Sequence, residues 1–166
     1  MIDNSQVRLR PQTNDDKDFL QHLYISTRVA DLKQLGWAPA EMQAFLSQQH
    51  EIQYLSYRNQ YRDAEFQIIE YQAELVGRLY LHRGSDEYRI IDISLLAEFR
   101  NRQLGRYLIQ NIQDCATTSS IPVSLHVEKT NPAIRLYQHL GFEKKEDRGI
   151  HWLMQWESFR SAELDR

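Results

Sequence analysis

The spacing of hydrophobic and polar positions divides the chain into helices and strands in a mixed order. Segments in which apolar residues recur at every third or fourth position are typical of helices that bury one face. Short apolar segments bounded by turn residues indicate strands. In chain order the pattern predicts strand 7–10, helix 15–34, helix 39–55, strands 66–71, 75–82 and 88–96, helix 105–118, strand 123–127, helix 132–140 and strands 142–147 and 150–156.

Single residues mark two of these boundaries. Gly36 breaks the first helix, and Pro39 opens the second at a first-turn position, where a proline gives up no helical hydrogen bond. A tight turn around Gln72–Glu74 joins the two strands that flank it, so those strands are expected to form a hairpin.

The second half of the chain sets the fold class. Residues 88–140 alternate strand, helix, strand and helix, which favours a parallel strand pair joined by a right-handed crossover. With the other strands added, the expected fold is α/β: a twisted mixed sheet with helices on both faces. The length of 166 residues fits one domain, over residues 1–166, with a core of its own.

Composition excludes several functional classes. The formal net charge of −3 offers no basic footprint for nucleic acid. No apolar run approaches the ~20 residues that span a bilayer, and the N-terminus has no hydrophobic signal region, so we expect a cytoplasmic protein that binds no membrane. The histidines show no metal-ligand spacing, so no metal is expected. Cys115 is the only cysteine, and its place on a helical apolar stripe predicts a buried thiol.

The turn between strand 88–96 and helix 105–118 is a candidate anion site. The end of a strand that leads directly into a helix presents unpaired backbone N–H groups and the positive end of the helix dipole. Arg100, Arg102 and Arg106 add positive charge there. The turn matches neither the P-loop nor the Rossmann glycine pattern, so nucleotide sites of those two kinds lose their main support.

A second motif follows the strand 123–127. It reads Asn131-Pro132-Ala133-Ile134-Arg135-Leu136-Tyr137, with Gly141-Phe142 shortly after. Asn131 and Pro132 also have the form of a helix N-cap and a first helical residue, and Gly141 that of a left-handed helix terminator.

Together, in this order and separation, the two motifs resemble those of the GNAT superfamily of acyl-CoA-dependent N-acyltransferases. Arg100 and Gly105 fit that family's pyrophosphate loop, whereas Gln103 stands where the family usually has a glycine. If this position needs a positive φ, Gln103 costs more than glycine would. The resemblance covers roughly residues 88–147 and implies a GNAT-like fold whose strands 88–96 and 123–127 splay apart.

The resemblance implies acetyl-CoA as co-substrate. Its pantetheine arm would lie in the gap between strands 88–96 and 123–127 and contact backbone groups at the end of strand 88–96. An N–H near Leu95 would stabilise the oxyanion. The loop N–H groups would bind the pyrophosphate, and Asn131 would hold the arm or order its loop. The cofactor-binding residues expected from the resemblance are Leu95, Leu96, Ala97, Arg100, Asn101, Arg102, Leu104, Gly105, Arg106, Asn131 and Ala133.

Two side chains are candidates for the chemistry. Tyr137 is the expected general acid, because a phenol of pKa ~10 protonates a thiolate of pKa ~8.5 at a cost of about 2 kcal/mol. Asp92, on the central strand, is the expected base for the acceptor amine; the alternative is that it pairs with Arg89 or Arg78 and does no chemistry. Glu128 and His126 are reserves, and proton removal by water alone is a further alternative.

The acceptor is expected to be a small-molecule or peptide amine. The region 24–61 would shape its cleft and is rich in aromatic residues, namely Tyr24, Trp37, Tyr54, Tyr57 and Tyr61, which could equally pack the helices on the sheet. Two copies could pair as a homodimer through the apolar C-terminal strands. Two other readings stay open: a GNAT-like acyl-CoA sensor without turnover, and a phosphometabolite-binding α/β protein that shares only the anion site.

Overall fold

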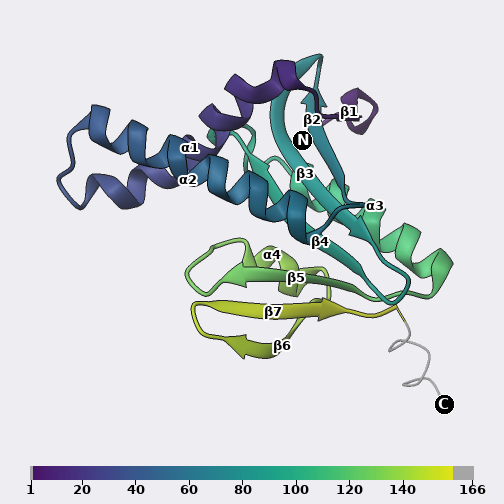
Figure 1. Ribbon diagram of the computed structural model, residues 1–166. Helices are drawn as coiled ribbons and strands as arrows, with labels where there is room; N and C mark the ends of the chain where they lie inside the picture. The colour runs from purple at the N-terminus through teal and green to yellow at the C-terminus, as the bar shows by residue number, and fades with distance from the viewer. Residues whose placement is uncertain (1, 159–166) are drawn as a thin grey trace. The chain divides into compact units, whose positions relative to one another are not determined.

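The structure is a computed structural model that describes residues 2–158, so the ends of the predicted domain 1–166 lie outside the described residues. Its helices and strands follow the predicted order (Figure 1). They are β1 Val7–Pro11, α1 Lys17–Lys33, α2 Pro39–Gln60, β2 Glu65–Tyr71, β3 Glu74–Arg83, β4 Tyr88–Leu95, α3 Leu104–Ser119, β5 Val123–Glu128, α4 Ile134–His139, β6 Glu143–Arg148 and β7 His151–Trp156.

The strands form a mixed sheet in the order β1-β2-β3-β4-β5-β7-β6. The chain divides into two compact units: Met1–Tyr80 with Asp92–Arg102 (unit 1), and Leu81–Ile91 with Gln103–Arg166 (unit 2). Both β3 and β4 contribute to each unit. The mixed α/β sheet is confirmed, while the single domain stays a prediction.

Unit 1 contains the helix pair and the N-terminal strands. Pro39 begins α2, as predicted. α1 and α2 lie side by side (Figure 1) around a small core of Tyr24, Met42 and Leu46. β1 pairs antiparallel with β2, from Val7 opposite Tyr71 onward. No helix in the described part of the chain is long and apolar enough to cross a membrane.

The predicted hairpin of β2 and β3 is confirmed, although its turn lacks glycine. Gln72 and Ala73 have φ values of 51° and 66°. Two consecutive left-handed residues are what a two-residue turn between twisted strands requires. Farther along β3, Gly77 meets a different need, because a Cβ there would collide with the carbonyl oxygen of Ser94 on β4.

Unit 2 contains the parallel pair. Tyr88, Arg89 and Ile90 of β4 pair with Val123, Ser124 and Leu125 of β5, which confirms the predicted parallel arrangement. The splay beyond this paired segment stays a prediction. α3 contacts β5 through a buried apolar face, formed by Leu104, Leu108, Ile109, Ile112 and Ala116.

The prediction of a buried Cys115 is wrong, because its side chain is exposed. The buried face of α3 runs through Ile109, Gln113 and Ala116, which leaves Cys115 at its edge. Gln113 is buried because its Nε2 donates to the carbonyl oxygen of Leu140, at 2.8 Å. Gln113 therefore occupies a core position on α3 because it donates to the carbonyl at the end of α4.

The C-terminal strands differ from the expected apolar edge. β7 lies between β5 and β6, so its backbone is paired on both sides. β6 has the sequence EKKEDR, all of it exposed. Such a charged strand disfavours edge-to-edge pairing. The homodimer stays a prediction, and the apolar β7 side chains do not form an edge that would support it.

Candidate active site

The N-terminus of α3, where the sequence predicts an anion site, lies in unit 2. Its first helical hydrogen bond is donated by the N–H of Tyr107 to the carbonyl oxygen of Gln103, at 3.0 Å. The N–H groups of Leu104, Gly105 and Arg106 precede that bond, and the side chain of Gln103 does not cap them. A helix of 16 residues therefore presents its first-turn donors and its positive dipole end.

The residues at this helix end fit a ligand that approaches the backbone closely. A Cβ at Gly105 would meet only Leu136 Cδ2, at 3.7 Å, which is an ordinary contact. The protein's own packing therefore does not require glycine here. A phosphate held by the first-turn N–H groups would supply such a requirement.

The loop before α3 is strained. Gln103 has φ 67° and ψ 10°, and Asn101 has φ 59°. The expectation that a positive φ would make glutamine costly at position 103 therefore applies. Asparagine tolerates this region better than glutamine does.

In unit 1, the residues before this loop form hydrogen bonds with nearby backbone groups. Leu96 N–H donates to the Val76 carbonyl oxygen at 2.9 Å, and Arg100 Nε donates to the Leu95 carbonyl oxygen at 3.0 Å. Ala97 offers its carbonyl oxygen to the N–H of Arg100, at 3.2 Å. The Leu96 N–H is thus engaged, so the predicted oxyanion donor would be another N–H. Arg102 places its guanidinium over the Phe99 ring, 5.4 Å from the centroid.

Asp92 forms an ion pair, as one of the two alternatives expected. Its Oδ2 accepts a hydrogen bond from Arg78 Nη2, and its Oδ1 accepts one from Ser94 Oγ at 2.7 Å. The Arg78 side chain is 3% exposed and that of Asp92 15%. The pairing does not by itself exclude proton transfer, so the role of Asp92 as a base stays a prediction.

Tyr137 lies on α4 in unit 2 and is buried. Its ring packs against Phe142, with centroids 5.9 Å apart. α4 begins at Ile134, two residues later than predicted, because Asn131 forms a side-chain turn first: its Oδ1 accepts from the N–H of Ala133 at 2.9 Å. Asn131 therefore orders its loop, and Gly141 ends the helix with φ 92°, as predicted.

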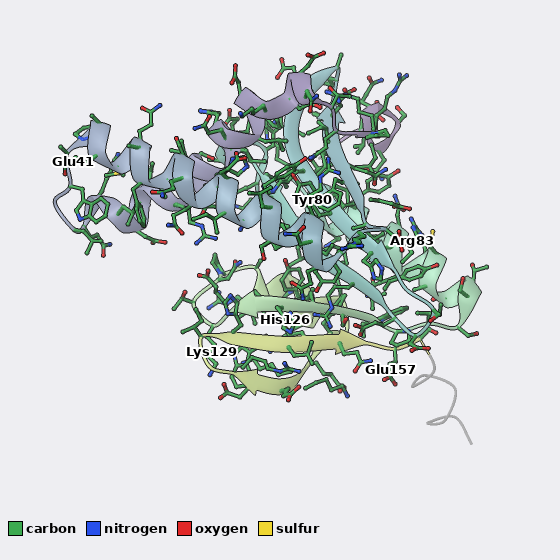
Figure 2. All side chains as sticks on the ribbon, viewed as in Figure 1. Glu41, Tyr80, Arg83, His126, Lys129 and Glu157 are labelled. Carbon is green, nitrogen blue, oxygen red and sulfur yellow. The ribbon has the colours of Figure 1, made fainter. Side chains whose placement is uncertain are left out.

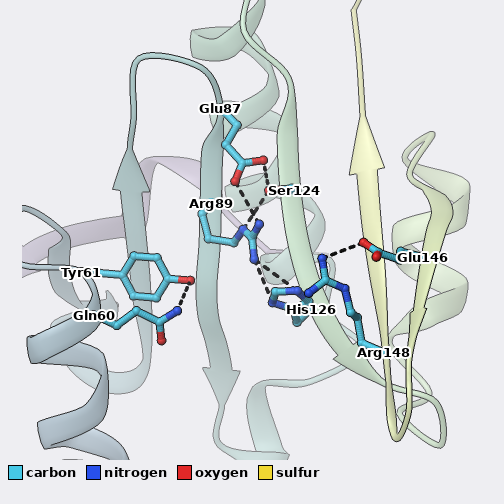
Figure 3. Close-up of polar contacts among 8 residues, drawn as sticks. All are labelled: Gln60, Tyr61, Glu87, Arg89, Ser124, His126, Glu146 and Arg148. Atoms are coloured by element: carbon cyan, nitrogen blue, oxygen red, sulfur yellow. Dashed lines mark hydrogen bonds and ion pairs between the residues drawn. The ribbon is translucent and has the colours of Figure 1, made fainter.

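His126 lies against the guanidinium of Arg89 (Figure 3). Arg89 Nη1 is 2.8 Å from His126 Nδ1 and 3.4 Å from its Nε2. Arg89 also binds Glu87 at 2.9 Å and the buried Ser124 hydroxyl at 2.8 Å. Burial and the Arg89 charge lower the pKa of His126. His126 is thus a weak base; the other reserve, Glu128, is exposed on β5.

Three of the five aromatic residues expected around the acceptor form ring pairs within unit 1. Tyr80 lies on β3 (Figure 2) and meets Tyr57 of α2 edge to face, with centroids 6.2 Å apart. The other pairs are Tyr24–His50, between α1 and α2, and Trp37–Phe45, whose two side chains are exposed. Packing of a helix on the sheet is therefore observed for Tyr57, and an acceptor cleft stays a prediction.

Sequence reasoning missed two polar features. His50 is buried on α2, and helical spacing gave it no mark beyond its place among apolar residues. The bonded set of Glu87, Arg89 and Ser124 joins two neighbouring residues to one that is distant in sequence, and only the strand register could have indicated it. Among residues 2–158, no group of three or more His, Cys, Asp or Glu side chains could hold a metal ion.

Comparison with known proteins identifies the family. The sequence profile of the acetyltransferase (GNAT) family matches residues 29–142. The chain belongs to this family. The resemblance drawn from the two motifs is thereby confirmed, and the profile includes residues of both units. No match was found among curated proteins.

Solved GNAT structures share the fold at low sequence identity. The PaiA N-acetyltransferase from Thermoplasma acidophilum, in complex with coenzyme A, has a TM-score of 0.70 at 14% identity, covering 91% of this chain and 98% of that one. A GNAT family acetyltransferase from Elizabethkingia anophelis with acetyl-CoA bound has a TM-score of 0.58 at 17% identity, covering 93% and 99%. Ard1 from Thermoplasma volcanium has a TM-score of 0.59 at 16% identity, covering 92% and 97%.

Proposed function

We propose that this protein is an N-acetyltransferase that transfers an acetyl group from acetyl-CoA to a primary amine. The observation that carries the proposal is the uncapped N-terminus of α3 at Gly105, where the protein's own packing leaves room for a Cβ. Family membership supports the acetyl transfer, and two similar structures contain coenzyme A or acetyl-CoA. The acceptor is a small-molecule or peptide amine.

The first turn of α3 would bind the pyrophosphate of acetyl-CoA. Its donors are the N–H groups of Leu104, Gly105 and Arg106, and guanidinium groups of the same stretch would add positive charge. Backbone groups of residues 95–97 would contact the pantetheine arm. The remaining side chains assigned to this role are Arg100, Asn101, Arg102, Asn131 and Ala133.

The reaction is a direct attack in a ternary complex. The amine nitrogen forms a bond to the acetyl carbonyl carbon, and the bond from that carbon to sulfur breaks. Tyr137 gives its proton to the departing thiolate, which costs about 2 kcal/mol for an ordinary phenol and thiol. Asp92 accepts a proton from the ammonium group, which frees the lone pair that attacks. A second proton leaves the nitrogen as the amide forms and restores the phenol of Tyr137.

Calorimetric titration with acetyl-CoA, free CoA and ATP tests the cofactor assignment. We expect both CoA species to bind and ATP to bind less tightly, with Arg100→Ala weakening binding and Tyr137→Phe preserving it. Arg62→Ala, at an exposed arginine, is the control for an equal change of charge. No binding of either CoA species would overturn the proposal.

Thiol release in the presence of cadaverine, glycinamide or p-anisidine tests turnover. These amines represent aliphatic, peptide-like and aromatic acceptors. We expect at least one to be acetylated, and Tyr137→Phe to lower kcat by about 10²-fold or more, as for loss of a general acid. Tight acetyl-CoA binding without turnover of any amine would instead favour the alternative, an acyl-CoA sensor. The strained backbone at Gln103 and the ion pair of Asp92 are the observations that support it.

A further inference from the structure

Unit 1 contains an ion pair, Arg78 with Asp92, that is largely shielded from solvent. Arg78 of β3 donates through Nη2 to Asp92 of β4, and the same nitrogen donates to Gln53 Oε1 of α2 at 2.8 Å. Ser94 holds the second oxygen of Asp92. Both carboxylate oxygens are therefore fixed by neighbours from the sheet, and the arginine is fixed in turn from the helix above it.

Three titratable groups beside this pair are neutral at neutral pH. Burial lowers the pKa of His50, and the nearby charge of Arg78 lowers it further, so the imidazole stays uncharged. Burial raises the pKa of the Tyr57 phenol, and it raises that of Tyr80 to about 12. Arg78 also lies over the Tyr80 ring, 4.8 Å from its centroid. Charged side chains act on these groups as well, namely Glu51 and Lys17 on His50 and Arg28 on Tyr57.

Stability alone does not account for such a pair. Taking two charges out of water costs several kcal/mol per ion, and apolar replacements of buried pairs are often neutral or stabilising. The cluster is also incompletely bonded, since Arg78 Nε and His50 Nε2 have no hydrogen-bond partner among residues 2–158. Buried polar groups without a hydrogen-bond partner are rare in native proteins, so each one needs a physical explanation.

The two ends of the pair differ in access to solvent. The Arg78 side chain is 3% exposed, whereas that of Asp92 is 15% exposed. Of the two side chains, that of Asp92 is therefore the more accessible. Loss of the arginine would remove one of the two hydrogen-bond donors that hold the carboxylate and leave it free to change orientation.

We propose that Arg78 is a positioning residue for acetyl transfer: it holds the Asp92 carboxylate in one orientation, in which the carboxylate accepts a proton from a cationic amine. This inference rests on the proposed function and extends it to the acceptor class. An ammonium ion R–NH₃⁺ gives one proton to the carboxylate, which leaves R–NH₂ with a lone pair and Asp92 as a neutral acid. The acid then passes the proton to water. The acceptor is accordingly an aliphatic primary amine, protonated at neutral pH.

Carboxyl ¹³C NMR tests the positioning without any turnover. Protein labelled at the aspartate carboxyl carbons is compared at pH 6 as wild type, Arg78→Lys and Arg78→Met, with the Asp92 signal assigned by its absence in Asp92→Asn. We expect the same Asp92 chemical shift in wild type and Arg78→Lys, and a displaced signal in Arg78→Met, because the carboxylate loses its hydrogen bond to the guanidinium. The control Arg89→Met, which removes another arginine paired with a carboxylate, should leave the Asp92 signal unchanged. An unchanged signal in Arg78→Met would overturn the inference.

Kinetics with two amines tests the acceptor class. Cadaverine is protonated at pH 7 and must lose a proton before its nitrogen can attack. p-Anisidine is mostly neutral at this pH, so its nitrogen can attack without that step. With cadaverine, Arg78→Met should lower kcat by about 10- to 100-fold with the acetyl-CoA KM within about twofold, and Arg78→Lys should recover most of the loss. With p-anisidine the loss should be small. Equal losses with both amines would overturn the inference.

A double variant separates positioning from stability. Removing one partner of a buried pair can unfold a protein, so Arg78→Met with Asp92→Asn removes both charges together. If Arg78 acts through Asp92, this variant should be no slower with cadaverine than Asp92→Asn alone; a further loss of about 10-fold would contradict the inference. If no amine is acetylated by the wild type, the proposed function fails, and the NMR comparison still decides whether Arg78 positions Asp92.

Discussion

Replacing Gly105 with alanine should move stability and cofactor binding in opposite directions. The added Cβ meets only Leu136 Cδ2, at 3.7 Å, so the folded protein accommodates it. Gly105 is the second residue of α3, and alanine there is favoured over glycine by about 0.5–1 kcal/mol. For a chain of this length, that gain corresponds to a rise in Tm of about 1–4 °C.

Binding should weaken because the methyl group would stand where the pyrophosphate approaches the helix backbone. A hydrogen bond to a charged group contributes about 1.5–3 kcal/mol, so the loss of one corresponds to about a tenfold or larger rise in Kd. Thermal unfolding without ligand and calorimetry with acetyl-CoA measure the two effects on the same Gly105→Ala sample. Asn111→Ala, at an exposed position of α3, is the control: it should raise stability by about 0.5 kcal/mol and leave Kd unchanged.

Two outcomes would refute this reasoning. If Gly105→Ala binds acetyl-CoA as tightly as the wild type, the first turn of α3 is not the close approach that the proposal needs. If the variant is less stable than the wild type, a contact within the protein requires the glycine after all. The Asn111→Ala control separates a general effect on the helix from an effect at its N-terminus.

Three further predictions concern stability. Gly77→Ala should destabilise the protein by about 1–3 kcal/mol or more, because its Cβ would collide with a β4 carbonyl oxygen; denaturant unfolding with an unchanged midpoint would contradict this. The folded-state pKa of His50 is lowered, so the unfolded chain binds its proton first and stability should fall as pH drops below about 6.5, by at most ~1.4 kcal/mol per pH unit. His50→Gln should flatten that loss in a pH series of unfolding curves and the exposed His22→Gln should not; equal slopes would refute the assignment. Gln103→Gly should relieve about 1–2 kcal/mol of strain, as should Ala73→Gly in the β2–β3 turn, but only the former should change the acetyl-CoA Kd.

The order of helices and strands was predictable because the information is local. Hydrophobic periodicity marks a buried face within one element, and Pro39 or Gly141 marks an end through its own backbone preference. The errors arose where a side chain far along the chain decides. Gln113 takes a core position on α3 because a carbonyl at the end of α4 needs a donor, and Cys115 is left at the edge of the buried face.

The candidate site was predictable only in part, for the same reason. The uncapped N-terminus of α3, the proposed pyrophosphate site, follows from residues that are adjacent in sequence, and so does the turn at Asn131. The partner of Asp92 could be narrowed to two arginines, but the choice between them depends on how β3 and β4 align. The neutral groups beside the pair, including His50, depend on the placement of α2 over the sheet, which no sequence period records.

The backbone strain itself distinguishes the α3 loop from other parts of the described chain. Gln72 and Ala73 have positive φ because a two-residue hairpin turn demands it, and Ser120 has φ 57° at the end of α3, where chains commonly turn left-handed. Asn101 and Gln103 serve neither a hairpin nor a helix C-terminus. A left-handed conformation costs about 1–2 kcal/mol for a residue with a side chain, and such strain persists where function requires the geometry. The two strained residues directly precede the helix end that would bind the pyrophosphate. Glutamine instead of glycine at position 103 therefore lowers the stability of the fold at the proposed binding site.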